Sequence, residues 1–141
     1  MRLKATLIGT LALAILAMSA LGAVAQTAKE KAIDAGATQL TSDQIADLLV
    51  GKTVTARSGG KRFLFHYSED NVLSGKLIGG GWSGTGYYGI TDDDRVCLSM
   101  AKDKGRLRCL TLLSSNGAVK KYNVNGDMTF ELLAFQEGKH L

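Results

Sequence analysis

The sequence predicts a mainly β protein: a small antiparallel meander of about eight short strands rolled into a barrel-like sheet, behind one short amphipathic helix. Three observations support this prediction. Apolar residues recur with a period of two from Gly51 onward, and turn-forming residues interrupt them about every ten residues. Two cysteines, Cys97 and Cys109, flank one of these turns symmetrically. Closure into a barrel would leave no strand edge unpaired.

The start of the chain has the composition of a secretory signal peptide. Arg2 and Lys4 form a basic start, residues 7–21 are almost wholly apolar, and Ala23-Val24-Ala25 offers the small-x-small pattern of a cleavage site. A polar stretch follows in place of a basic stop-transfer patch, and the cleavage point has no cysteine for a lipid anchor. We therefore expect cleavage after Ala25, export from the cytosol, and no integral membrane span in the mature protein.

The size and charge of the mature chain favour one domain and argue against a nucleic-acid partner. Cleavage of the 141 residues after Ala25 would leave 116, which is enough for a single core. The leader takes two of the 17 basic residues with it, leaving 15 against 13 acidic ones. The remaining basic residues are scattered in small groups, whereas nucleic-acid binders concentrate them in a stripe.

The predicted β-barrel-like domain comprises residues 40–141. Its first element is predicted to be a helix. The preceding residues, 26–39, are alanine-rich and polar, which indicates either a flexible segment or a weak helix. Thr41 and Gln44 then form a capping box, and Gly51 supplies a left-handed stop. The apolar face of this helix consists of Ile45, Leu48 and Leu49.

Alternating segments between turn residues predict the strands. Asn116-Gly117 and Asn125-Gly126 are strong hairpin signals because both residue types tolerate a positive φ. The expected strands are Thr53–Arg57, Arg62–Tyr67, Asn71–Ile78, Thr85–Thr91, Asp94–Ala101, Arg106–Leu113, Ala118–Val124 and Met128–Phe135.

The two cysteines fix the register of one hairpin. Cys97 and Cys109 lie at equal distances from Asp103, so a turn centred there places them directly opposite each other. Such neighbours are close enough to bridge, and an oxidising compartment favours the disulfide. The other face of this hairpin would then face the core, with Val96, Leu98, Met100, Leu110 and Leu112.

Motifs for catalysis or cofactor binding are weak. Gly84-Thr85-Gly86-Tyr87-Tyr88-Gly89 matches a dinucleotide fingerprint by letter, but an alternating strand follows it where the fingerprint needs a helix. The only histidines are His66 and His140, and an acid–base role for His66 with a nearby carboxylate is the least favoured hypothesis. We expect no catalytic residue, no metal and no cofactor.

Residues 79–89 form the one unusual segment, rich in glycine and carrying three aromatic residues. In a structural interpretation the glycines let a strand bend and the aromatic side chains fill the gap. In a functional interpretation the aromatic residues grip a ligand or partner at a barrel mouth. The candidate binding residues are Trp82, Tyr87 and Tyr88.

Several motifs together resemble those of small exported proteins of unknown function from Gram-negative bacteria. The shared features are a leader, a helix before Gly51-Lys52-Thr53, a Gly/Trp-rich strand, a turn followed by x-x-Cys at Cys97, and a second cysteine one hairpin later. The likeness covers residues from 40 to about 135. It implies a periplasmic location and brings no catalytic residues.

Two further likenesses concern the barrel and its function. The expected barrel is lipocalin-like, and Gly80-x-Trp82 is similar to the lipocalin signature, although that signature belongs on a first strand. Periplasmic lysozyme inhibitors are similar in size, leader and barrel, and Ser74-Gly75-Lys76 resembles their Ser-Gly loop. We therefore expect a periplasmic, non-enzymatic domain that binds an unknown small ligand or envelope protein. The alternative is an inhibitor of a cell-wall hydrolase such as lysozyme.

Overall fold

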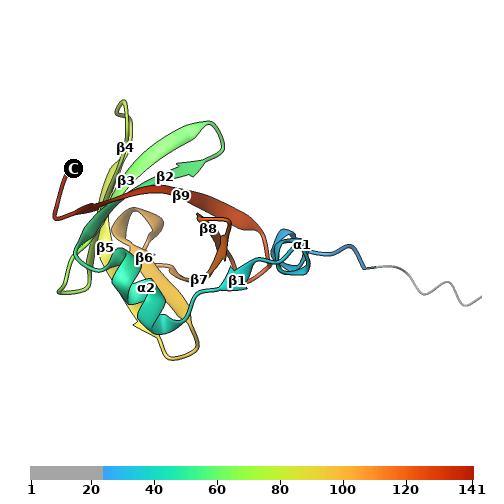
Figure 1. Ribbon diagram of the computed structural model, residues 1–141. Coiled ribbons are helices and arrows are strands. Elements are labelled where there is room, and N and C mark those ends of the chain that lie inside the picture. Colours follow the sequence, from blue (N-terminus) through green and yellow to red (C-terminus); the bar gives the residue numbers. More distant parts are fainter. Residues whose placement is uncertain (1–23) are drawn as a thin grey trace, which may run out of the picture.

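The barrel is built by the strands that follow Gly51. The computed structural model describes residues 24–141, so the predicted signal peptide lies outside it except for its last two residues. Eight antiparallel strands form a meander, and pairing of β9 with β2 closes it (Figure 1). The strands are β2 Lys52–Ser58, β3 Lys61–Tyr67, β4 Val72–Leu77, β5 Ser83–Thr91, β6 Arg95–Met100, β7 Leu107–Ser115, β8 Ala118–Tyr122 and β9 Met128–Glu137. The predicted fold class is confirmed, and each predicted strand overlaps an observed one.

The hairpin connections use residues that tolerate a positive φ. Asn116 and Gly117, between β7 and β8, have φ of 50° and 80°, as a two-residue hairpin turn requires. Three consecutive glycines, residues 79–81, have φ of 95°, 89° and 98° in the β4–β5 connection. Residues with a Cβ rarely adopt this conformation, so the glycine run is explained by the turn itself.

The disulfide lies where the hairpin register places it. Cys97 in β6 is paired with Cys109 in β7, and their sulfurs are bonded. The neighbouring pair, Val96 and Leu110, is buried inside the barrel, which confirms the predicted core side of this hairpin. A short 3-10 helix, η1 (Ala101–Asp103), makes the turn between the two strands.

The predicted helix closes one end of the barrel. It is α2, Ser42–Leu49, and its capping box is present: the Gln44 N–H donates to the Thr41 hydroxyl and the Thr41 N–H donates to the Gln44 side chain. α2 contacts β2 as well as β5 and β6. Since β2 and the β5–β6 pair stand on different sides of the closed sheet, the helix spans the opening between them (Figure 1).

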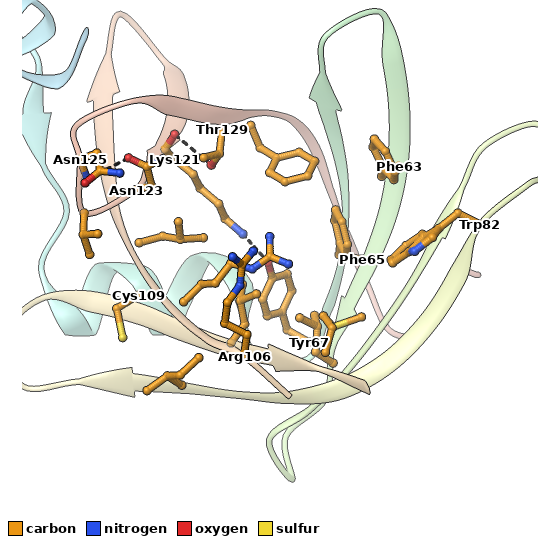
Figure 2. A pocket seen from close by; sticks show the side chains of 18 residues that line it. Phe63, Phe65, Tyr67, Trp82, Arg106, Cys109, Lys121, Asn123, Asn125 and Thr129 are labelled. Carbon is orange, nitrogen blue, oxygen red and sulfur yellow. Dashed lines mark hydrogen bonds between the residues drawn. The ribbon is translucent and has the colours of Figure 1, made fainter. Parts of the chain in front are cut away.

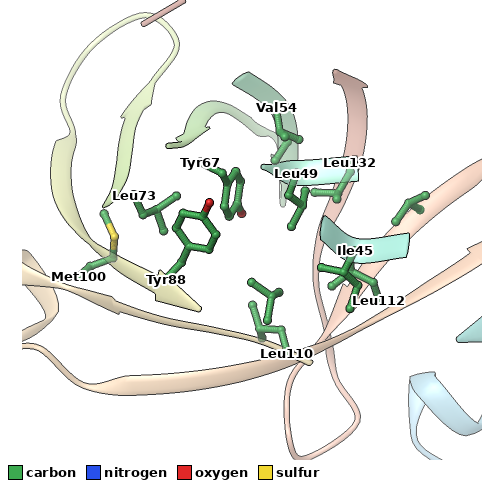
Figure 3. Close-up of a cluster of buried hydrophobic side chains, with 13 residues drawn as sticks. Ile45, Leu49, Val54, Tyr67, Leu73, Tyr88, Met100, Leu110, Leu112 and Leu132 are labelled. Atoms are coloured by element: carbon green, nitrogen blue, oxygen red, sulfur yellow. The ribbon is translucent and has the colours of Figure 1, made fainter. Parts of the chain in front are cut away.

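The hydrophobic core fills the barrel beneath α2. Ile45 and Leu49 point inward from the helix and are wholly buried (Figure 3). Tyr67 and Tyr88 pack edge to face with ring centroids 5.0 Å apart. The core is completed by Val54, Ala56, Leu73, Val96, Met100, Leu110, Leu112, Val119 and Leu132.

The segment before α2 packs outside the barrel. The sequence was compatible with either a flexible chain or a weak helix in this segment. The structure has a helix, α1 (Ala28–Asp34), followed by the short strand β1 (Thr38–Gln39). β1 pairs with the end of β7, and α1 lies beyond it on the outside of the barrel (Figure 1). Over residues 24–141, no helix has the length and apolar content needed to cross a membrane.

Candidate functional site

The end of the barrel opposite α2 is hollow. A cavity of about 450 Å³ opens there, and the side chains around it converge on its interior (Figure 2). An eight-stranded barrel has room either for a filling of side chains or for one small ligand. Here α2 and the core occupy one half, and the other half has the space for a ligand. Its lining comprises Phe63, Phe65, Tyr67, Leu73, Trp82, Leu98, Met100, Arg106, Leu107, Arg108, Cys109, Leu110, Lys121, Asn123, Val124, Asn125, Thr129 and Phe130.

Burial separates a floor from a mouth. Tyr67 and Lys121 are 1% and 2% exposed, so they lie at the floor, against the packed core. Leu107 and Val124 are 69% and 76% exposed although they line the same cavity, so they belong to its rim. The mouth therefore carries apolar side chains, which is typical of a surface that admits an apolar molecule.

One wall of the cavity is aromatic. Phe63 and Phe65 project inward from β3, and Trp82 lies beside them, just before β5 begins (Figure 2). Phe130 lines the cavity from β9. The centroid distances are 5.6 Å for Phe63–Phe130, 5.5 Å for Phe65–Phe130 and 5.9 Å for Phe63–Trp82, each in an edge-on geometry. These contacts hold the rings in place before any ligand arrives.

Two glycines in the sheet make room for Trp82. Gly75 and Gly84 are opposite each other in β4 and β5. A Cβ on Gly75 would lie 2.7 Å from the Phe65 ring, and one on Gly84 would lie 3.2 Å from the Trp82 indole. The absence of side chains at these positions therefore lets the indole lie close to the strands.

A lysine lies at the floor of the cavity. Lys121 projects inward from β8 and donates a hydrogen bond of 2.5 Å to the Tyr67 hydroxyl (Figure 2). Its ammonium also lies 5.0 Å from the centroid of the Tyr67 ring, within the range of a cation–π contact. An ammonium has three N–H donors, and Tyr67 is its sole hydrogen-bond partner among the described residues.

The cavity lining is positively charged. It contains three cationic residues, Lys121, Arg106 and Arg108, and no aspartate or glutamate. Asp103, in the adjoining turn, forms ion pairs with both arginines but is not itself part of the lining. Lys121 has no ion pair with any described residue, so the deepest charge in the cavity is uncompensated.

The three predicted binding residues do not form one surface. Trp82 is in the aromatic wall, as a contact residue at a barrel mouth should be. Tyr87 is 69% exposed on the outer face of β5, away from the cavity. Tyr88 points the other way and is 5% exposed in the core, where its hydroxyl donates to the Ser68 carbonyl. Burial and the neighbouring Tyr67 raise the pKa of Tyr88.

The other motifs considered in the sequence also have definite places. His66 lies on the outer face of β3, paired with Thr53 and Ser74, and partial burial lowers its pKa. The Gly84–Gly89 run lies wholly within β5, where a dinucleotide fingerprint would need a strand-to-helix turn. The Ser-Gly pair that resembled an inhibitor loop, Ser74-Gly75, lies within β4.

Sequence reasoning missed the aromatic wall and Lys121. A signal for Lys121 was present. Val119 and Lys121 are two residues apart in β8, so they share one face of the strand, and an inward Val119 implies an inward Lys121. Phe63 and Phe65 alternate along β3, but no local signal places Phe130 beside them, because β9 pairs with β2 only through closure of the sheet.

Comparisons with protein-family models, with curated proteins and with solved structures found no match. The resemblance to small exported proteins therefore stays a prediction. The disulfide is consistent with an oxidising compartment. Within residues 24–141, no cluster of three or more His, Cys, Asp or Glu side chains is placed to hold a metal ion.

Proposed function

We propose that this protein is a non-enzymatic, periplasmic binding domain that takes up a small, largely apolar molecule in the open half of its barrel. The supporting observation is the cavity of about 450 Å³, with its aromatic wall and its exposed apolar rim. Ligand pockets span about 300–1,000 Å³ and combine an apolar lining with a few polar groups. The periplasmic location rests on the predicted leader and on the disulfide.

Trp82 offers a direct test because it is the only tryptophan in the chain and borders the cavity. The neutral fluorophore N-phenyl-1-naphthylamine accepts excitation energy from a nearby indole. We expect saturable energy transfer from Trp82 with one site per chain. Absence of binding to the natively folded, disulfide-bonded protein would overturn the proposal.

Two alanine variants separate the cavity from the outer surface. Phe130→Ala removes one ring of the wall and should weaken binding of the fluorophore by about tenfold, as loss of buried aromatic area implies. Tyr87→Ala, on the outer face of β5, should leave the affinity unchanged. Both variants keep the Trp82 donor, so the same signal reports on each. The opposite pattern would move the binding surface to the outside of the barrel.

A further inference from the structure

Building on the proposed function, we infer that the ligand is an amphipathic anion: an apolar or aromatic body held by the aromatic wall, with a single anionic headgroup bound by the Lys121 ammonium. The observations behind this are the burial of Lys121, its lack of a carboxylate partner, and the position of its side chain beside Phe130.

A buried ammonium is costly unless it is paired. Removal of a charged group from water disfavours folding by several kcal/mol, and buried charges in proteins are therefore usually paired with an opposite charge. Lys121 is 2% exposed, and its described contacts are the hydroxyl and ring of Tyr67. A single neutral acceptor leaves two N–H donors for another group. An anion entering the cavity would supply both the charge and the missing acceptors.

The register of the barrel places the charge next to the apolar wall. Lys121 in β8 is directly opposite Phe130 in β9, and both side chains point inward. A ligand whose headgroup is bound at Lys121 therefore has its apolar body beside Phe130 and Phe65, whose ring centroids are 5.5 Å apart. This juxtaposition matches a molecule whose charged and apolar parts are directly connected.

The rest of the lining favours an anion over a cation or a neutral polar molecule. Arg106 and Arg108 line the cavity nearer its mouth, and the lining has no acidic side chain. One carboxylate, Asp103, pairs with both arginines, so the two keep a net positive charge, which raises the local concentration of anions and repels cationic ligands. Lysine binds as a point charge without the planar fork of arginine, so carboxylate, sulfonate and phosphate headgroups all fit this chemistry.

A matched pair of fluorophores tests the headgroup. 8-Anilino-1-naphthalenesulfonate has the same aromatic body as N-phenyl-1-naphthylamine and adds one sulfonate. We expect the anionic compound to bind at the same site about tenfold or more tighter, as a charged hydrogen bond implies. If the neutral compound binds and the sulfonate adds nothing, the inference on the headgroup is wrong while the proposed function stands. If the neutral compound does not bind, the proposed function itself fails.

A matched pair of variants locates the charge. Lys121→Met removes the buried ammonium, and Lys120→Met makes the same change one residue earlier, on the outer face of β8 beside Glu131. Lys121→Met should abolish the preference for the sulfonate while keeping affinity for the neutral compound. Lys120→Met should change neither. Equal effects of the two variants would show that net charge, and not the Lys121 site, governs the preference.

Competition with aliphatic compounds extends the test to other headgroups. Decanoate and decyl phosphate should displace the bound fluorophore, and decan-1-ol, which lacks the charge, should need about tenfold more compound. Retention of this difference in Lys121→Met would contradict the assignment. Near-ultraviolet circular dichroism of each variant checks that its tertiary structure is intact, so that dye binding does not come from a loose, partly unfolded state.

Discussion

The two ends of the barrel use the same eight strands for different purposes. At the end closed by α2, Ile45 and Leu49 are wholly buried and the interior is packed. At the open end, Leu107 and Val124 are mostly exposed around a cavity. The difference follows from one helix, because α2 covers one end with Ile45 and Leu49, and no helix covers the other end in the described part of the chain. Stability should therefore depend on the closed end, and binding on the open end.

The same substitution at the two ends gives the largest expected contrast. Leu49→Ala leaves a cavity beneath α2 and should lower the free energy of unfolding by about 2–5 kcal/mol. Leu107→Ala, at the mouth, truncates a side chain that is 69% exposed and should change stability by about 0.5 kcal/mol or less. Urea denaturation with the disulfide intact measures both. Similar losses would show that the open end is packed as tightly as the closed one.

Gly75→Ala should affect the open end alone and should lower the free energy of unfolding by less than Leu49→Ala. The Cβ of Gly75→Ala would lie 2.7 Å from the Phe65 ring, which must then move into the cavity. We expect a loss of stability of about 1–3 kcal/mol and weaker binding of the neutral fluorophore, since the added methylene takes ligand space.

Gly89→Ala is the control for this change. A Cβ at Gly89 would meet nothing within 4 Å, so stability and affinity should both stay close to those of the parent protein. Should Gly75→Ala bind the fluorophore as tightly as Gly89→Ala, the ligand does not reach the Phe65 side of the cavity.

The helix that closes one end and the hairpin that carries the disulfide were predictable from the sequence because their determinants are local. The Thr41–Gln44 capping box fixes the start of α2, and the cysteine spacing fixes the register of β6 and β7. The aromatic wall of the open end was not predictable in the same way. Phe130 meets Phe63 and Phe65 because β2 pairs with β9, and alternation along single strands does not encode that closure.

The candidate residues show the same division between local and long-range information. Tyr87 and Tyr88 are neighbours, so a strand must send them to opposite faces, and only one of them can reach the barrel interior. The functional interpretation grouped Tyr87 and Tyr88 on one binding surface although the predicted strand Thr85–Thr91 contains both. In the structure β5 runs from Ser83 to Thr91, and Trp82 is the one predicted contact residue at the cavity.

The last comparison concerns the polar pair at the boundary between the two halves. Tyr67→Phe removes the hydroxyl that accepts from Lys121 and leaves a buried ammonium without its described hydrogen bond. This should cost about 1–3 kcal/mol. Adding Lys121→Met removes the charge as well, so the double variant should return to the stability of the parent protein or exceed it.

A double-mutant cycle in urea measures this coupling. A structural lysine would make the double variant the least stable of the series, because both partners would contribute to packing. A lysine kept for an anionic ligand gives the reverse order, with stability regained and the preference for the sulfonate lost. If the double variant regains stability and also loses the preference for the sulfonate, Lys121 belongs to the half of the barrel that binds and not to the packed half.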